Sequence, residues 1–510
     1  MSGTPARWWH VPAAFLAGTL PALAFPAPAL WWLAYVALVP WLLVLRAAPG
    51  GRRAAVCGWL GGTGFVLATH HWLTPHVHVF LLPLAALLGL LWAPWGWLAH
   101  RLLAGPSGGR HTLRAVVLLP SGWLVAELVR SWEYAGGPWG MLGASQWQWT
   151  PALRVAALGG VWLVGWLIVA VNVAVTVVLT RPLARGRLAA AGVLGCCALL
   201  GLGAWASAAP PPVSGAARIA VVQPGELNAA EPRFARGLEL TRALAGREVD
   251  LVVWAESSVG FDLSARPERA AQLAGASRAV GAPLLVNVDA RRVGGPGIFK
   301  SSVLVDAEGV TGDRYDKMRL VPFGEYVPLR SVLGWVTQVG QAARVDRVRG
   351  GEPVVMDADG LRAGPLICFE TAFPDMSRQL VREGAQVLVG QSATSSFQET
   401  WAPEQHASLG ALRAAETGRS MVHATLTGVT AVYGPGGEPV GPRLGPSRGA
   451  AEVYPVPLAA GETPYVRIGD WAVWLSLGTL ALAGGVALGH RMARRGEVLT
   501  GVTPAEAPRR

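Results

Sequence analysis

A cysteine at the end of an apolar run is the residue in this sequence best suited to covalent chemistry. Residues 364–367 lead into Cys368, and Glu370 follows two positions later. This pattern predicts a buried strand that delivers a thiol to the edge of a sheet. Such a thiol is a nucleophile when a base or a positive charge favours its thiolate. Otherwise it is an inert packing residue. Glu370 either shares the side of Cys368 on a continuing strand or begins a helix.

A second apolar run ends in an acid. Residues 251–255 are Leu-Val-Val-Trp-Ala, and Glu256 follows them. A carboxylate at the end of a strand, in a dry pocket, has a raised pKa and becomes a usable base. Taken alone, the same acid also fits a helix cap or a turn. Its assignment as a base therefore depends on the other motifs.

Residues 315–328 form a third motif, which mixes charged and aromatic residues with Gly and Pro and has no helix or strand period. Lys317 within it is one of two lysines among 43 basic residues. Its compact ammonium can stabilise an oxyanion, a role that a guanidinium does not reproduce. Glu325 can orient Lys317 or assist the base. The alternative is a surface loop of ion pairs, and the other lysine, Lys300, is explained by chance.

The elements that must position these residues are short β-rich runs with helix-like stretches between them. This alternation predicts an α/β domain over residues 216–460. Helix-like stretches lie between several of these runs, such as 266–280 and 402–417. The expected strands are 218–223, 250–254, 283–289, 301–306, 364–369, 386–390, 421–425 and 429–433.

The overall composition is that of a membrane protein with a soluble insert. Of the 510 residues 52% are hydrophobic and only 15% are charged, and 23 are tryptophan. The formal net charge is +11, but many arginines flank apolar segments rather than cluster on a soluble face. Membrane topology explains that distribution, so nucleic-acid binding is excluded as an interpretation.

The apolar segments predict eight membrane-spanning helices, since each is close to the roughly 20 residues that cross a bilayer. Residues 1–207 form a bundle of seven, 208–215 a linker, and 468–490 the eighth helix. The tail 491–510 is rich in Arg, Pro and Glu and is expected to be disordered. The seven segments of the bundle are 9–25, 28–45, 54–73, 79–100, 113–132, 154–180 and 187–207.

The short loops predict the orientation of these helices. Arginines lie before the first helix, in alternate loops, and after the eighth helix, whereas the loops near 26–28, 74–78 and 133–153 contain no Lys or Arg. By the positive-inside rule both termini are cytoplasmic. Seven crossings then place residues 208–467 on the outer face.

No metal or cofactor site is expected from the spacing of cysteines and histidines. Three of the four cysteines, Cys57, Cys196 and Cys197, lie in apolar segments. A histidine cluster at positions 70, 71, 76 and 78 fits no standard zinc spacing, so a polar loop at the membrane surface is the better interpretation.

Taken together, the order Glu256, Lys317, Cys368 resembles the Glu-Lys-Cys triad of the nitrilase superfamily. With seven helices before the α/β domain and one after it, the chain resembles more closely the membrane-bound branch, the apolipoprotein N-acyltransferases. The motif Lys-x-x-Leu-Val-Pro-Phe-Gly-Glu-Tyr-Val-Pro is the most specific part of this likeness. Further matching positions are Gly137, Pro138, Trp139, Gly143, Gln146, Asn172, Val222, Gln223, Arg413, Glu416, Gly418, Arg419 and residues 427–430.

The resemblance implies a fold, an activity and partners. The fold is a helical membrane domain joined to an αββα sandwich. The activity is transfer of an acyl chain from a phospholipid to the α-amine of a diacylglyceryl-cysteine lipoprotein, through a thioester on Cys368 and without a cofactor. Expected alternatives are a membrane-anchored amidase or nitrilase that uses water, and an inactive lipid-binding scaffold. The resemblance places the enzyme in the bacterial inner membrane, and we expect a monomer.

The resemblance also implies supporting and substrate-binding residues. Glu325, Glu370 and Phe369 are expected to support the triad. Trp139, Gln146, Phe234 and Phe397 are expected to bind substrate or gate its entry. Around the expected triad, the sequence departs from the family pattern at four places. Residues 391–397 replace an aromatic loop, and Phe369 replaces a Tyr. Lys300 stands where the family has an Asn, and Phe234 alone replaces a Lys-Trp pair.

Overall fold

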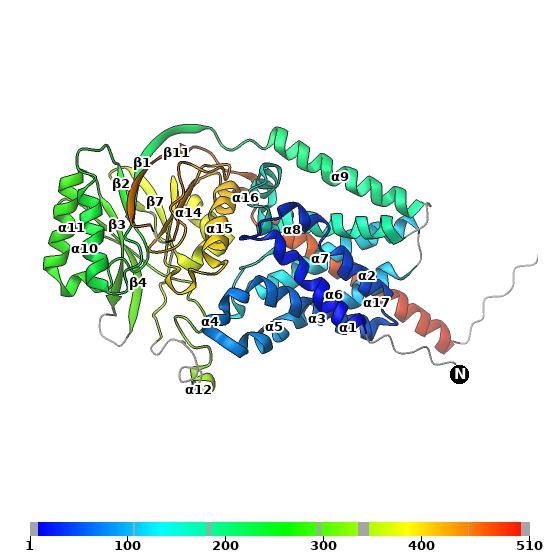
Figure 1. Cartoon of the computed structure of the whole chain (residues 1–510). Helices are drawn as coiled ribbons and strands as arrows, with labels where there is room; N and C mark the ends of the chain where they lie inside the picture. Colours follow the sequence, from blue (N-terminus) through cyan, green and yellow to red (C-terminus); the bar gives the residue numbers. More distant parts are fainter. Residues whose placement is uncertain are drawn as a thin grey trace, which may run out of the picture.

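The computed structural model describes residues 9–105, 108–180, 185–292, 297–334, 346–446 and 448–500. An α/β domain lies at one end of an elongated molecule, and a bundle of helices forms the other end (Figure 1). Among the described residues, five helical stretches are long and apolar enough to cross a membrane. They are His71–Leu103, Gly109–Arg130, Thr150–Thr180, Arg185–Ser207 and Trp471–His490.

The first half of the bundle is more broken than the apolar segments predict. Segments 9–25 and 28–45 each combine a short α-helix with a 3₁₀ turn, and 79–100 is interrupted near its middle. Prolines explain these breaks, because Pro21, Pro40 and Pro94 each stand in the first turn of a new helix, where a missing N–H costs least. The elements are α1 (His10–Thr19), α2 (Val39–Ala47), α3 (Gly51–Thr69), α4 (Thr74–Val77), α5 (Leu81–Gly89) and α6 (Ala93–Leu103).

The remaining helices of the bundle are longer. They are α7 (Gly109–Arg130), α8 (Thr150–Thr180), α9 (Arg185–Ser207) and, after the α/β domain, α17 (Trp471–Thr500). Helix α17 continues ten residues beyond the predicted boundary at 490, and the rest of the predicted tail, 501–510, lies outside the described residues. Helix α8 is kinked at Gly159 and Gly160, where the backbone is not helical.

The α/β domain contains two sheets. The six-stranded sheet has the order β11-β1-β2-β3-β4-β5, and the five-stranded sheet has the order β10-β9-β8-β7-β6. Strands β1, β2 and β3 are parallel, as are β7, β8 and β9. The first sheet is built from β1 (Val213–Gln223), β2 (Leu251–Trp254), β3 (Leu284–Arg291), β4 (Ile298–Val305), β5 (Val310–Asp316) and β11 (Ala450–Ala459). The second is built from β6 (Met356–Ala358), β7 (Leu361–Ile367), β8 (Val387–Ser392), β9 (Ser420–Thr425) and β10 (Ala431–Tyr433).

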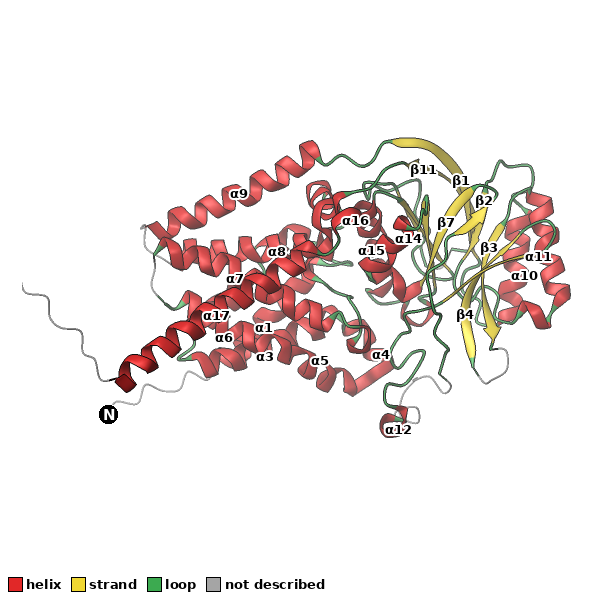
Figure 2. Cartoon of the chain, turned by 180° about the vertical axis from the view of Figure 1, so that it is seen from behind, coloured by secondary structure: helices red, strands yellow, loops and turns green. Residues whose placement is uncertain are grey.

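Helices cover the outer face of each sheet, which gives four layers (Figure 2). Helices α10 (Ala230–Arg242) and α11 (Pro267–Val280) pack on the six-stranded sheet, and a separate apolar core lies beneath them. Helices α14 (Pro374–Arg382) and α15 (Ala402–Thr417) pack on the five-stranded sheet, and α15 also contacts α8 of the bundle. The predicted αββα sandwich is therefore confirmed.

Several elements of the α/β domain were not predicted from the sequence patterns, and for four of them the reason can be identified. Strand β11 carries two prolines, which are tolerated because it lies at an edge of its sheet and pairs only with β1. Strand β5 is an edge strand of mostly polar, exposed residues, and β6 has three residues. The short helix α16 (Pro464–Ile468), just before α17, follows a cap in which the Thr463 hydroxyl accepts from the Val466 amide.

The two halves of the molecule are joined by hydrogen bonds and ion pairs. Arg319 and Arg349 of the α/β domain pair with Glu133, which follows α7, at 3.0 and 2.7 Å. The indole of Trp139 donates to the Gln405 side chain at 2.8 Å. These contacts place the segment between β5 and β6, and the start of α15, beside the loop that joins α7 and α8.

Candidate active site

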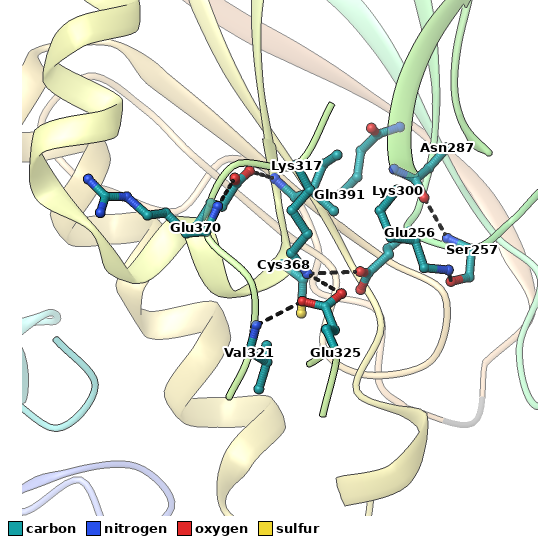
Figure 3. A network of polar contacts seen from close by, with 12 residues as sticks. Glu256, Ser257, Asn287, Lys300, Lys317, Val321, Glu325, Cys368, Glu370 and Gln391 are labelled. Atoms are coloured by element: carbon teal, nitrogen blue, oxygen red, sulfur yellow. Dashed lines mark hydrogen bonds and ion pairs between the residues drawn. The ribbon is translucent and has the colours of Figure 1, made fainter. Parts of the chain in front are cut away.

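The three residues of the predicted triad come from the ends of three strands. Glu256 follows β2, Lys317 follows β5, and Cys368 follows β7. The first two strands belong to one sheet and the third to the other, so the residues meet between the two sheets. Figure 3 shows the sulfur of Cys368 next to the Lys317 side chain and the carboxylates of Glu256 and Glu325. The structure thus brings together all three residues and Glu325.

Lys317 is the electrostatic centre of this group. Its side chain is 1% exposed, and its Nζ lies 2.9 Å from Oε1 of Glu325 and 3.2 Å from Oε1 of Glu256. The second oxygen of Glu325 accepts from the Val321 amide at 2.9 Å. Burial opposes the charged ammonium, but the two carboxylates outweigh burial and raise the pKa of Lys317 well above its usual value. The lysine is therefore a fixed cation.

The two carboxylates around one ammonium leave a net negative charge in a buried place. The Glu256 carboxylate lies beside Cys368, and its contact with the Lys317 ammonium is drawn in Figure 3. The geometry is suited to a proton acceptor next to a thiol.

Cys368 has a backbone conformation that L-residues rarely adopt. Its φ is 54°, and a five-residue 3₁₀ turn, Cys368–Ala372, begins at it. Such conformations cost about 1–3 kcal/mol and persist where surrounding contacts hold them. The Cys368 carbonyl is hydrogen bonded to Nε2 of His406, on α15, at 2.9 Å. The sharp turn ends the strand and points the thiol at Lys317 and Glu256.

The surroundings keep the resting thiol protonated. Burial raises the pKa of Cys368, and the Glu256 carboxylate raises it further, whereas Lys317 lowers it. The net effect is a strongly raised pKa. Because the thiolate is the nucleophile, a cysteine in this site needs a base to accept its proton.

Glu370 lies within the 3₁₀ turn and does not share a strand side with Cys368, because β7 ends at Ile367. Its carboxylate is fully buried and accepts four hydrogen bonds. The donors are the hydroxyl of Tyr315 at 2.8 Å and the amides of Met318, Arg319 and Ile367 at 2.7, 3.0 and 2.7 Å. Glu370 thus ties the turn at Cys368 to the residues on both sides of Lys317.

Lys300 also contributes to the site, although chance explains it in the sequence. Its Nζ lies 2.5 Å from Asp289 and donates to the hydroxyl of Ser257 at 2.5 Å. Ser257 follows Glu256, has a φ of 58°, and donates its amide to Asn287 at 2.9 Å. Lys300 and Asn287 therefore fix the backbone beside Glu256.

Gln391 is a second residue that sequence patterns did not single out as part of the site. It lies on β8 beside Ile367 of β7, and its side chain is fully buried. Its amide donates to the Trp254 carbonyl at 2.5 Å and to the Leu285 carbonyl at 3.2 Å, and its oxygen accepts from Ser302. A buried polar residue at the end of a strand was the one available signal. Gln391 connects the strand before Cys368 with the strand before Glu256.

The residues expected to gate the site separate into two groups. Trp139 and Phe397 both pack against Trp72 of the bundle. Their ring centroids lie 5.1 and 5.0 Å, respectively, from the ring centroid of Trp72. Trp139 also lies 5.2 Å from His406, the residue bonded to the Cys368 carbonyl. These two aromatics stand between the bundle and the active centre.

The other two gate candidates lie elsewhere. Gln146 is fully buried inside the bundle and donates to the Trp31 carbonyl at 2.9 Å. Phe234 is fully buried beneath α10, against Trp254 and Phe261. Phe369, expected to support the triad, packs edge-on against Phe373 at 5.0 Å and lies against Gly137 of the outer loop.

Two family models match the two parts of the chain. Residues 17–174 match the family described as apolipoprotein N-acyltransferase N-terminal domain, and residues 218–449 match carbon-nitrogen hydrolase. Among solved structures, an amidase of the nitrilase superfamily from Nesterenkonia has 19% sequence identity and a TM-score of 0.36, covering 51% of this chain and 95% of its own.

Curated relatives extend along almost the whole chain. The apolipoprotein N-acyltransferase of Azotobacter vinelandii is 32% identical over 94% of this chain and 95% of its own length. That of Pseudomonas aeruginosa is 31% identical over 92% and 94%, and that of Geobacter metallireducens is 29% identical over 93% and 94%. The match covers both the membrane bundle and the α/β domain. The chain therefore belongs to the apolipoprotein N-acyltransferase family.

Proposed function

We propose that this protein transfers an acyl chain from a phospholipid to the N-terminal α-amine of a diacylglyceryl-cysteine lipoprotein, through a thioester on Cys368. The observation that carries the proposal is the placement of Cys368, at a strained turn, beside the pair formed by Lys317 and Glu256 at 3.2 Å. The family of the chain and its apolar helices support a lipid donor and a lipid-anchored acceptor.

In the first half-reaction, Glu256 accepts the thiol proton of Cys368 as the sulfur attacks the ester carbonyl of the phospholipid. The tetrahedral oxyanion is stabilised by the Lys317 ammonium and by a backbone N–H of the turn at Cys368. The ester C–O bond then breaks, and Glu256 returns the proton to the departing lysophospholipid alkoxide. A thioester remains on Cys368.

In the second half-reaction, the α-amine of the lipoprotein attacks the thioester carbonyl. Glu256 accepts a proton from the amine, and the C–S bond breaks as the amide forms. The proton passes to the Cys368 sulfur and restores the resting thiol, whose raised pKa keeps it protonated. Glu325 holds Lys317 in place in both halves through its 2.9 Å contact.

The same arrangement suits substrates that stay in a bilayer. Each methylene moved from hydrocarbon into water costs about 0.8 kcal/mol, so the acyl chains remain at the membrane while the ester reacts. Trp139 and Phe397, between bundle and active centre, line the entrance for these chains. We further propose eight membrane crossings, cytoplasmic termini, an outer-face catalytic domain of the inner membrane, and a monomeric enzyme.

The test is mass spectrometry of the purified protein after incubation with dioleoyl phosphatidylethanolamine alone. We expect one oleoyl adduct on Cys368, which a diacylated lipopeptide then removes as an N-oleoyl product. Cys368→Ser should give no thioester, while Cys196→Ala, a matched change in α9, should leave the adduct intact.

Two results would contradict the proposal. Free fatty acid without N-acyl peptide would indicate a hydrolase that uses water. Absence of any adduct in the unaltered protein, with lipid bound, would indicate a lipid-binding scaffold.

A further inference from the structure

A large hollow lies in the bundle, away from the active centre. Helices α6, α7 and α17 enclose a cavity of about 1050 Å³. All of its lining residues belong to these three helices, and none comes from the α/β domain. Figures 1 and 2 show α17 running from the junction with the α/β domain to the opposite end of the bundle. The hollow opens along the middle of this helix, at residues 479–490.

The walls of the hollow are apolar and uncovered. Leu113 and Val117 of α7, and Leu482 and Val486 of α17, line it and are all exposed. Small residues on α17 create the space: a Cβ added at Gly484, which lines the hollow, would meet no atom within 4 Å. In a membrane, such a wall is complementary to hydrocarbon chains.

One end of the hollow is cationic. Arg101 lies near the end of α6, Arg114 lies in the second turn of α7, and His490 lies on α17, all at the end remote from the α/β domain. Arg101 stacks on the ring of Trp97, with its guanidinium carbon 5.4 Å from the ring centroid. Within the described residues, neither arginine forms an ion pair.

The sequence also lacks acidic residues that would neutralise this end. No Asp or Glu precedes Glu127, so α1 to α6 and the loops between them contain only basic charges. The positive-inside rule explains arginines at this membrane face, but it does not explain why two of them border an apolar hollow. Basic pockets between membrane helices on this side of a bilayer are suited to anionic lipid head groups.

We propose that the hollow between α6, α7 and α17 binds one anionic phospholipid of the leaflet opposite the catalytic domain. Its phosphate contacts Arg101 and Arg114, and its acyl chains lie along Leu113, Val117 and Val486. This lipid is distinct from the acyl donor, because the hollow is lined by helices of the bundle alone, whereas Cys368 lies in the α/β domain. The bound lipid fills the gap beside α17 and holds this last helix against α6 and α7.

The test uses the full-length protein in nanodiscs of dioleoyl phosphatidylcholine with 10% dioleoyl phosphatidylglycerol. Native mass spectrometry after transfer to detergent counts the lipids that remain bound. We expect one retained phosphatidylglycerol in preference to phosphatidylcholine. A lipid retained in the active centre would be present in every variant. It therefore does not affect the difference in lipid retention between the variants.

The central variant is Arg101→Gln with Arg114→Gln. Each cationic residue near an anionic head group contributes about 1 kcal/mol, or about fivefold in affinity, so the double change should lower retention by about 20-fold. The matched control is Arg52→Gln with Arg185→Gln, which removes the same charge at the same end of the bundle but outside the hollow. The control should retain the lipid.

A second variant tests the acyl-chain walls without changing charge. Gly484→Leu fills the hollow and should reduce retention while both arginines remain. Equal losses in the arginine variant and its control would overturn the proposal, because they would indicate surface charge alone. Equal retention of phosphatidylcholine, unaltered retention in Gly484→Leu, or displacement of the lipid by 10 mM inorganic phosphate would overturn it as well.

Discussion

The two sheets of the α/β domain contribute to the active centre in different ways. The six-stranded sheet supplies the charged residues, Glu256 and Lys317, which contact each other at 3.2 Å. The five-stranded sheet supplies Cys368 from a turn with φ 54°. The charged part is therefore assembled within one sheet, whereas the thiol reaches it only through the packing of two sheets. In the proposed mechanism, residues that connect the two sheets control the geometry of the reaction as much as the three proposed catalytic residues do.

The largest effect on activity should come from changing Lys317, one of the charged residues that the six-stranded sheet supplies. Lys317→Arg keeps the positive charge, but a planar guanidinium cannot occupy the fully buried place between two carboxylates. Since Lys317 is proposed to stabilise the oxyanion, we expect acyl-adduct formation to slow by about 10²–10³-fold. Rates of adduct formation measured by mass spectrometry check this, and a near-normal rate would remove Lys317 from the oxyanion role.

The next largest effect should come from changing Glu370, whose hydrogen bonds connect the turn at Cys368 with the residues on both sides of Lys317. Glu370→Gln replaces one accepting oxygen with an amide that cannot accept from the backbone N–H groups around it. We expect the free energy of unfolding to fall by about 1–3 kcal/mol and turnover by about 100-fold, because the two catalytic residues lose their register. Denaturant unfolding and single-turnover kinetics measure both. Glu383→Gln, a change of the same type at an exposed residue after α14, serves as the control.

Changing Gln391, which connects the strands near Cys368 and Glu256, should have a smaller effect on activity. Gln391→Met retains the shape of the side chain but loses its hydrogen bonds to the Trp254 and Leu285 carbonyls. We expect about a tenfold lower kcat with an unchanged KM, because the base and the thiol are less well aligned while the lipid entrance is untouched. A loss confined to KM would contradict this role for Gln391.

The smallest effect should come from changing His406, whose Nε2 is hydrogen bonded to the Cys368 carbonyl. Burial lowers the pKa of His406 to about 4 from 6.5, with the Cys368 carbonyl opposing this shift and Lys317 adding to it. Between these pH values the unfolded chain binds a proton that the folded chain does not, so stability should decrease as the pH falls from 6.5 to 4.

His406→Gln should remove this share of the acid sensitivity, because glutamine can still donate to the Cys368 carbonyl but does not titrate. Thermal unfolding followed across this pH range measures the effect, with turnover at neutral pH expected to change only a few-fold. His111→Gln, the same change in the first turn of α7 and outside the hollow, is the matched control.

Much of this architecture could be predicted from the sequence, because it depends on local patterns. The apolar runs before Glu256 and Cys368 gave the strands that deliver them, and the strand ends explain why these residues meet. The hydrogen bonds that hold these strand ends in place could not be predicted, because they join residues far apart in the sequence. Gln391 and Trp254 are 137 positions apart, and His406 and Cys368 are 38 apart. Phe234 lies in the packed core beside the six-stranded sheet, and its role in substrate entry, inferred from its position near Gln223, stays a prediction.

The kink of α8 has a consequence for how the protein is made. At Gly159 and Gly160 the helix is broken, and the freed amide of Val161 donates to the carboxylate of Glu416 at 2.7 Å, from a residue 255 positions later. During synthesis α8 enters the membrane long before Glu416 exists, and a buried amide without a partner costs about 1–3 kcal/mol. We therefore expect helix α8 to take its final shape only after the α/β domain has folded, which makes maturation of the bundle a late step of biogenesis.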